Sequence, residues 1–203
     1  CRMIRRIRIR KKKNKNKKIK VLIAPTPITQ LQGFDTTIIH ERFENTIKTL
    51  CSELENSDIE FAFKIHPSQS PHNEEIKEII QRNSKKSPIY LLNPTKNLIS
   101  SSDIIITITP EGWAPSTILL ESMIMGKPAL NIVLDEKLFN FEYILKHAVI
   151  SISHESIKDE IKKLINDENY RNEISNNALS FTKKFLSNYG ETSKQVAKIL
   201  LDE

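Results

Sequence analysis

The loop at residues 109–117, Thr-Pro-Glu-Gly-Trp-Ala-Pro-Ser-Thr, combines residue types that suit the binding of an anion. It follows a short apolar run, and Ser116 and Thr117 stand where a helix is expected to begin. A helix start carries unpaired backbone N–H groups and a partial positive charge, so it favours a phosphate. The two hydroxyls would add donors, and Gly112 would let the backbone approach a ligand closely. Ser116 could equally be an ordinary N-cap residue, so the loop by itself leaves both interpretations open.

Glu121 lies four residues after Thr117, one turn further along the same face of the expected helix. A carboxylate at that place can accept hydrogen bonds from both hydroxyls of a ribose. The alternative is a surface glutamate near a helix start, where the helix dipole favours negative charge. Apolar residues flank Glu121 on both sides, however, and a carboxylate buried among them without a partner would be costly. We therefore favour a ligand-binding role for Glu121.

The sequence Lys-Ile-His-Pro at positions 64–67 closes another apolar run. Side chains two residues apart on a strand share a side, so Lys64 and His66 should lie together at the carboxyl end of that strand. A lysine there could neutralise a diphosphate, and His66 is the candidate catalytic residue, as an acid or as a stabiliser of a leaving phosphate. The alternative for His66 is a loop histidine whose backbone is restrained by Pro67.

Short apolar runs alternate with amphipathic stretches from Lys20 onward, which is the pattern of βαβ units around a parallel sheet. The runs predict six strands, at residues 20–24, 59–65, 88–92, 103–108, 129–134 and 149–153. The amphipathic stretches predict helices at 40–54, 74–82 and 116–125, a single turn at 98–102, and helix over most of the last fifty residues. The predicted fold class is α/β, a doubly wound Rossmann-like parallel sheet of about six strands in the order 3-2-1-4-5-6, with C-terminal helices.

In such a sheet, ligands bind outside the carboxyl ends of the strands, at the point where strand order reverses. This rule selects the loops at residues 25–33, 66–71 and 109–117. With the residues discussed above, they give ten candidate substrate-binding residues: Thr26, Lys64, His66, Pro67, Thr109, Glu111, Gly112, Ser116, Thr117 and Glu121.

Three familiar ligand-binding motifs are absent from the sequence. The turn after the first strand lacks the G-x-G-x-x-G pattern, which argues against NAD and FAD. There is no G-x-x-x-x-G-K-[ST], the pattern of P-loop NTPases, and no Asp-x-Asp pair that would hold a sugar nucleotide through a divalent metal. We therefore expect neither a cofactor nor a metal, and the nucleotide-linked ligand is expected to be a substrate.

Positive charge is concentrated at the N-terminus. Residues 1–20 hold twelve of the 31 Lys and Arg residues and no acid, whereas the rest of the chain carries 19 basic and 25 acidic residues. We expect residues 1–18 to form a basic arm or linker and residues 19–203 to form one domain. The arm is either a solvated tail or a strip attracted to anionic lipid headgroups, at about 1 kcal/mol per Lys or Arg. No aromatic residue interleaves with these charges, so nucleic acid is not an expected partner.

Features of the whole chain predict its location. No apolar run reaches the roughly 18 to 20 residues that span a bilayer, and the basic N-terminus is not followed by the apolar region of a signal peptide. The two cysteines, Cys1 and Cys51, form no disulfide framework, and Cys51 should be a small core residue on a buried helix face. We expect a cytoplasmic protein that can attach peripherally to the inner face of the membrane. Because the chain begins with Cys rather than Met, we expect a fragment of a longer protein. The alternative is a stand-alone subunit that docks on a membrane partner.

The order of these motifs resembles the C-terminal, donor-binding half of GT-B-fold glycosyltransferases. The likeness is to bacterial sialyltransferases, capsule polysaccharide transferases and CDP-glycerol glycerophosphotransferases, which pair a His-Pro motif with a later Ser-Ser/Thr motif. The matching residues are His66-Pro67 and Ser116-Thr117. The stretch 101–128, which ends in Gly-Lys-Pro, is similar to GT-B donor domains generally, and by that resemblance Glu121 would hold the ribose.

The resemblance implies the donor-binding domain of a metal-independent glycosyltransferase or glycerophosphotransferase in surface polysaccharide biosynthesis. Its donor would be a nucleotide-activated sugar or a CDP-linked group, and an acceptor-binding domain or subunit would be its missing partner. Two alternatives remain open: a non-catalytic nucleotide-binding module targeted to membranes by its arm, and a sugar-nucleotide epimerase domain. Neither the base, the sugar nor the acceptor follows from the sequence.

Overall fold

A computed structural model describes residues 18–26, 36–57, 59–66, 72–110, 116–135, 141–186 and 191–201. Residues 1–17 lie outside these ranges, so the division into a basic arm and one domain stays a prediction.

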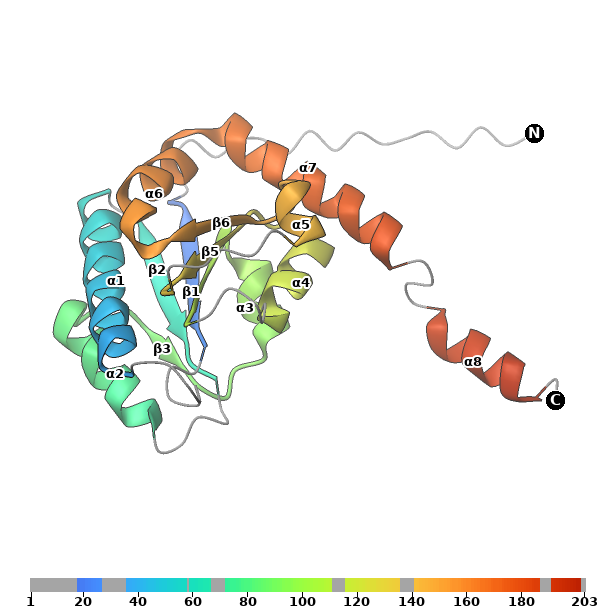
Figure 1. Ribbon diagram of the computed structural model, residues 1–203, viewed down its shortest axis with the longest axis horizontal. Coiled ribbons are helices and arrows are strands. Elements are labelled where there is room, and N and C mark those ends of the chain that lie inside the picture. The colour runs from blue at the N-terminus through green and yellow to red at the C-terminus, as the bar shows by residue number, and fades with distance from the viewer. Residues whose placement is uncertain are drawn as a thin grey trace.

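Six parallel strands form one sheet in the order β3-β2-β1-β4-β5-β6, which confirms the predicted fold class and strand order (Figure 1). All five pairs of neighbouring strands in this sheet are parallel. The direction of strand order reverses between β1 and β4, the two central strands. The strands are β1 Lys20–Pro25, β2 Glu60–Lys64, β3 Ile89–Tyr90, β4 Ile104–Thr109, β5 Ala129–Val133 and β6 Ile150–Ser153.

Helices cover both faces of the sheet, as the nearly continuous apolar strands require (Figure 1). They are α1 Thr36–Asn56, α2 His72–Asn83, α3 Thr95–Ser101, α4 Thr117–Ile124, α5 Glu142–Leu145, the 3-10 turn η2 His154–Ser156, α6 Ile157–Asn166, α7 Glu168–Phe185 and α8 Thr192–Leu201. The C-terminal helices are thus present as predicted. No helix among the described residues is long and apolar enough to cross a membrane.

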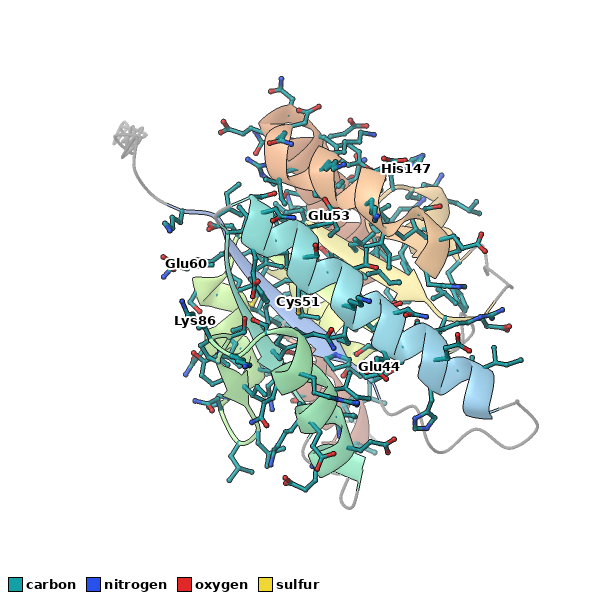
Figure 2. All side chains as sticks on the ribbon, turned by 90° about the vertical axis from the view of Figure 1, so that its left-hand side faces the viewer. Glu44, Cys51, Glu53, Glu60, Lys86 and His147 are labelled. Atoms are coloured by element: carbon teal, nitrogen blue, oxygen red, sulfur yellow. The ribbon has the colours of Figure 1, made fainter. Side chains whose placement is uncertain are left out.

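Alternate strand residues supply two cores, one on each face of the sheet. Ile104 and Ile106 pack toward α1, α2 and α6, whereas Ile105 and Leu22 pack toward α3 and α4. Cys51 lies on the buried face of α1, where burial raises the pKa of its thiol to about 12 (Figure 2). The prediction that Cys51 is a core residue is confirmed.

The turn after α4 shows why the Gly-Lys-Pro sequence stands there. Gly126 has φ 62°, a left-handed conformation that most residues avoid, and a Cβ on it would lie 3.0 Å from the side chain of Leu179. The Lys127 ammonium donates to the carbonyls of Ser100 and Ser102, 3.1 and 2.6 Å away, at the end of α3. The sequence therefore ends α4 and ties the chain after it to the end of α3, so it has a structural role here.

Candidate functional site

A cavity of about 320 Å³ lies at the carboxyl ends of β1 and β2, beside the start of α4. Four segments line it: residues 24–26 after β1, 64–66 after β2, 91–95 between β3 and α3, and 116–118 at the start of α4. It therefore adjoins the reversal in strand order, where a doubly wound sheet binds its ligands. Five of the predicted residues meet at this cavity, namely Thr26, Lys64, His66, Ser116 and Thr117.

Thr26 is fixed to the neighbouring strand β4. Its backbone N–H and its hydroxyl both donate to the carbonyl of Ile108, at 2.9 and 3.1 Å. Because the hydroxyl proton is used by that carbonyl, Thr26 can offer a ligand only the acceptor capacity of its oxygen. Thr26 thus holds the first loop against β4 while it forms part of the cavity wall.

Lys64 ends β2 and is buried, with 7% of its surface exposed. Its ammonium donates to the carbonyls of Ile65 and Leu91, 3.1 and 2.5 Å away. Burial lowers the pKa of this ammonium from its usual value of 10.5. The third N–H of the ammonium has no partner among the described residues. Lys64 therefore brings a positive charge with one unused donor to the cavity wall.

His66 follows Lys64 by two residues and is exposed at the cavity rim. This agrees with the predicted arrangement of the two residues at the end of one strand. Its motif partner Pro67 lies outside the described residues, as do Glu111 and Gly112.

Ser116 occupies the N-cap position of α4, but its side chain makes no capping hydrogen bond. The ordinary N-cap interpretation assumed that this hydroxyl accepts a hydrogen bond from a backbone N–H of the first turn, and it does not. Thr117 begins the helix and is exposed. Both residues line the cavity, so the start of α4 presents hydroxyls and backbone N–H groups together.

Glu121 and Thr109 do not line this cavity. Glu121 is half-buried, and its carboxylate makes no hydrogen bond or ion pair with the described part of the chain. Thr109, the last residue of β4, is fully buried, and its hydroxyl lies 3.1 Å from Asn131 Oδ1. A ligand role for either residue remains a prediction.

Two residues that the sequence analysis did not single out make polar contacts at or just beyond β5. Asn131 of β5 accepts hydrogen bonds from two threonines of β4, and a lone asparagine in an otherwise apolar strand was a signal that could have found it. Arg42 reaches from α1 and donates to the carbonyl of Leu134, 2.9 Å away, just beyond β5. Its role depends on how α1 packs, which the helical periodicity does not reveal.

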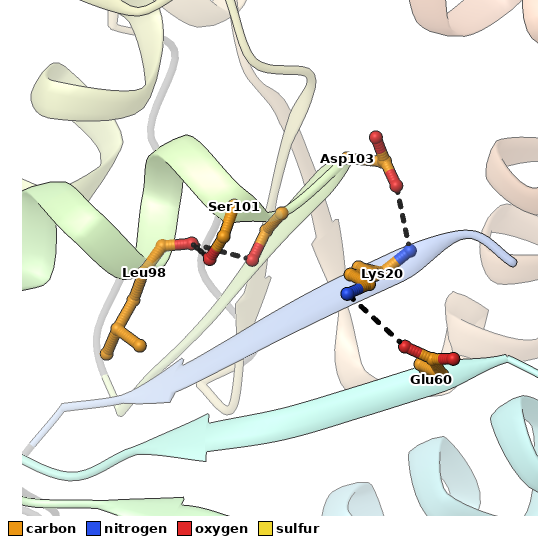
Figure 3. Close-up of polar contacts among 6 residues, drawn as sticks. Lys20, Glu60, Leu98, Ser101 and Asp103 are labelled. Carbon is orange, nitrogen blue, oxygen red and sulfur yellow. Dashed lines mark hydrogen bonds and ion pairs between the residues drawn. The ribbon is translucent and has the colours of Figure 1, made fainter. Parts of the chain in front are cut away.

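A larger hollow of about 900 Å³ includes the amino ends of β1 and β2. The backbone N–H of Lys20 donates to Asp103 there at 3.0 Å, and the Lys20 ammonium lies 3.5 Å from Glu60 (Figure 3). The Ser101 hydroxyl donates to the Leu98 carbonyl, 3.0 Å away (Figure 3). This hollow lies at the amino ends of the strands, whereas ligands of a doubly wound sheet bind at the carboxyl ends, so we take the smaller cavity as the candidate site. In the described ranges, no three His, Cys, Asp or Glu side chains gather to hold a metal ion.

Comparison with known proteins found no matching family model and no matching curated protein. Solved structures do match. A UDP-N-acetylglucosamine 2-epimerase from Listeria monocytogenes, described as putative, has a TM-score of 0.56 at 14% identity, over 86% of this chain and 47% of that one. WaaG, a glycosyltransferase of lipopolysaccharide biosynthesis, has a TM-score of 0.56 at 16% identity, over 84% and 45%. Os79 from O. sativa, solved with UDP, has a TM-score of 0.56 at 15% identity, over 91% and 42%.

These likenesses show a shared fold and nothing more, because the sequence identities are low. The chain is a Rossmann-like α/β domain of the kind found in GT-B glycosyltransferases and in UDP-N-acetylglucosamine 2-epimerases. It spans less than half the length of each of the three structures. The finer resemblance to sialyltransferases, capsule transferases and CDP-glycerol transferases stays a prediction.

Proposed function

We propose that this domain binds a nucleotide-activated sugar and is the donor-binding half of a metal-independent GT-B glycosyltransferase or glycerophosphotransferase. The observation that carries the proposal is the meeting of Thr26, Lys64, His66 and the Ser116-Thr117 pair at one cavity near the strand-order reversal. The shared fold with WaaG and with UDP-bound Os79 supports it.

The proposed roles follow from the chemistry of each group. The start of α4 and the hydroxyls of Ser116 and Thr117 would bind the phosphates, with Lys64 supplying positive charge. His66, at the exposed rim, would act as an acid or stabilise the leaving phosphate. Glu121, one turn further along α4, would accept hydrogen bonds from the ribose.

The wider setting is also part of the proposal. We propose surface polysaccharide biosynthesis at the inner face of the membrane, with a separate acceptor-binding domain or subunit as partner. The chain matches less than half of each comparable transferase, which supports a missing acceptor half. The concentration of basic residues in the first twenty positions supports attachment to anionic lipid.

Calorimetry of the chain with CMP, CDP, UDP and their sugar derivatives tests the core of the proposal. We expect at least one of them to bind, and we expect no glycosyl transfer by this chain alone. Lys64→Met should weaken binding by about tenfold or more, because a charge-assisted contact with phosphate is lost. Lys86→Met is the matched control, since Lys86 is exposed and lines only the larger of the two hollows. If no nucleotide binds, or if only Lys86→Met weakens binding, the proposed site is wrong.

An epimerase domain is the second candidate, favoured by the fold shared with the Listeria monocytogenes protein. Incubation with UDP-N-acetylglucosamine separates the two candidates. Inversion at C2 of the sugar, detected by NMR, would support the epimerase, whereas tighter binding of CMP or CDP derivatives than of UDP-N-acetylglucosamine supports the donor-domain proposal.

A further inference from the structure

Polar side chains form a buried row across β4, β5 and β6. The sheet register pairs Thr107 with Asn131, and Asn131 with Ser151. Thr107 donates from its hydroxyl to Asn131 Oδ1 at 2.8 Å, and Asn131 Nδ2 donates to the Ser151 hydroxyl at 3.4 Å. Thr107 is fully buried, and Asn131 is 4% exposed. The row is therefore buried at β4 and β5 and half-buried at Ser151 on β6, on the side of the sheet that α4 covers.

Thr109 joins this row from the end of β4. Its hydroxyl lies 3.1 Å from the same Asn131 Oδ1, and 3.4 Å from the carbonyl of Ile132. Both lone pairs of the Asn131 oxygen are thus engaged, by two hydroxyls that stand two residues apart on β4. Two threonines in equally buried surroundings share one acceptor, and they differ mainly in their distance from the end of the strand.

The row departs from the apolar packing on the rest of this face. The preceding residues on the same sides of their strands are Ile105 on β4 and Ala129 on β5, which belong to the apolar core under α4. Apolar packing would fill the same space without the desolvation that buried hydroxyls and an amide require. A satisfied network has the compensating property that each side chain is held in one orientation.

The side chain of Thr109 is held in its orientation at the end of β4, just before the chain continues toward α4. The Thr109 carbonyl accepts from the Leu134 N–H at 2.9 Å, and the Pro110 carbonyl accepts from the Asp135 N–H at 3.0 Å. The backbone of β4 is therefore fixed to the β5 side as far as Pro110, and Asn131 adds a side-chain constraint on Thr109. Six residues after Pro110, Ser116 enters the cavity wall.

We propose that Thr109 and Asn131 are positioning residues, whose hydrogen bond sets the direction in which the chain leaves β4 and so places Ser116 and Thr117 at the cavity. The effect on ligands rests on the proposed function, whereas the effect on the start of α4 does not. Neither Thr109 nor Asn131 lines the cavity, so both would act on it through the position of Ser116 and Thr117.

Thr109→Val and Thr107→Val form a matched pair for the first test. Each substitution keeps the side-chain volume nearly constant and removes one hydroxyl from the same Asn131 oxygen. We expect similar losses of stability for both. Hydrogen exchange of the hydrogen-bonded amides at residues 119–122, in the first turns of α4, followed without ligand, should accelerate about fivefold or more in Thr109→Val only. Thr109→Ser keeps the hydroxyl and should restore exchange close to the wild-type rate.

The second test measures UDP and uridine binding by calorimetry on the same variants. Thr109→Val should weaken UDP about tenfold and leave uridine unchanged, while Thr107→Val changes neither. Equal exchange rates at residues 119–122 in the two valine variants would overturn the positioning role. If the wild-type chain binds no UDP, the proposed ligand fails for that nucleotide, but the exchange experiment still decides the positioning role.

Discussion

Lys64 is an ammonium in a buried place, held by two carbonyls and lining a cavity. Burial lowers its pKa, so the folded protein holds this proton less tightly than the unfolded chain does. The charge therefore weakens the fold most below the lowered pKa, and this penalty disappears as the pH rises past the unfolded value of about 10.5. A costly charge at a cavity wall is what a site for an anion would contain.

Replacing Lys64 by Met should accordingly leave the protein as stable as the wild type, or more stable, at pH 7. The methionine removes a buried charge from a side chain of similar length. The stability advantage over the wild type should shrink as the pH approaches 10.5, because the wild-type lysine then becomes neutral in both states. Chemical denaturation at a series of pH values measures this. A large loss of stability with unchanged nucleotide affinity would instead make Lys64 a structural clamp between β2 and the chain after β3.

Glu121 gives the second test at this scale. Glu121→Ala should weaken nucleotide binding by about tenfold or more, because a charge-assisted hydrogen bond is worth roughly 1.5–3 kcal/mol. Thermal stability should hold or rise, since the carboxylate bonds to nothing in the described part of the chain. The variant should also lose its preference for ribose over 2′,3′-modified ribose. Ser116→Ala is the comparison variant, expected to weaken phosphate-bearing ligands while nucleoside binding stays the same.

At the scale of elements, the strand order followed from the sequence because each strand is a short apolar run bounded by clear breaks. Element ends were harder to predict. α1 begins at Thr36, four residues before the predicted start. The sequence pattern missed this first turn because it includes an exposed isoleucine, Ile38, which breaks the apolar periodicity. β3 is shorter than its apolar run, since only Ile89 and Tyr90 pair with β2. Boundaries of this kind depend on tertiary contacts.

The candidate site was predictable where it depends on strand ends and helix starts. Lys64 and Ser116 come together because parallel strands place their carboxyl ends along one edge. Asn131 was not predictable in the same way, because its partners are fixed by the register between β4 and β5. Glu121 lies on the same helix as Thr117 but does not line the cavity. The sequence could not show this, because the direction in which α4 leaves the cavity depends on how the helix packs.

The end of α4 supplies a prediction about a single element. Gly126→Ala should lower the free energy of unfolding by about 1–2 kcal/mol, since alanine is strained at positive φ and its Cβ would press on Leu179. The same change in a Leu179→Ala background should cost less, because the contact is removed and only the backbone strain remains. Urea denaturation of the four proteins of this cycle measures both terms. Equal costs in the two backgrounds would show that the Leu179 contact contributes nothing.

At the scale of the whole molecule, the contrast between a basic N-terminus and a mildly acidic remainder predicts separable behaviour. Deleting residues 1–17 should abolish sedimentation with anionic vesicles and leave nucleotide affinity unchanged, because β1 and the cavity are retained. Vesicle binding by the full chain should weaken with salt, since exposed charges are screened beyond roughly 10 Å at 0.1 M. Equal sedimentation with neutral and anionic vesicles would rule out an electrostatic attachment.

Cys51 offers a way to observe the whole molecule through one atom. Its thiol is buried in the core between α1 and the sheet and is protonated at neutral pH, so thiol-specific reagents cannot modify it in the folded protein. Modification must wait for α1 to separate from the sheet, and its rate, read at Cys51 by mass spectrometry, reports how often that opening occurs. Any nucleotide that binds only the folded domain should slow modification in proportion to its occupancy. The native sequence thus contains its own reporter of ligand binding.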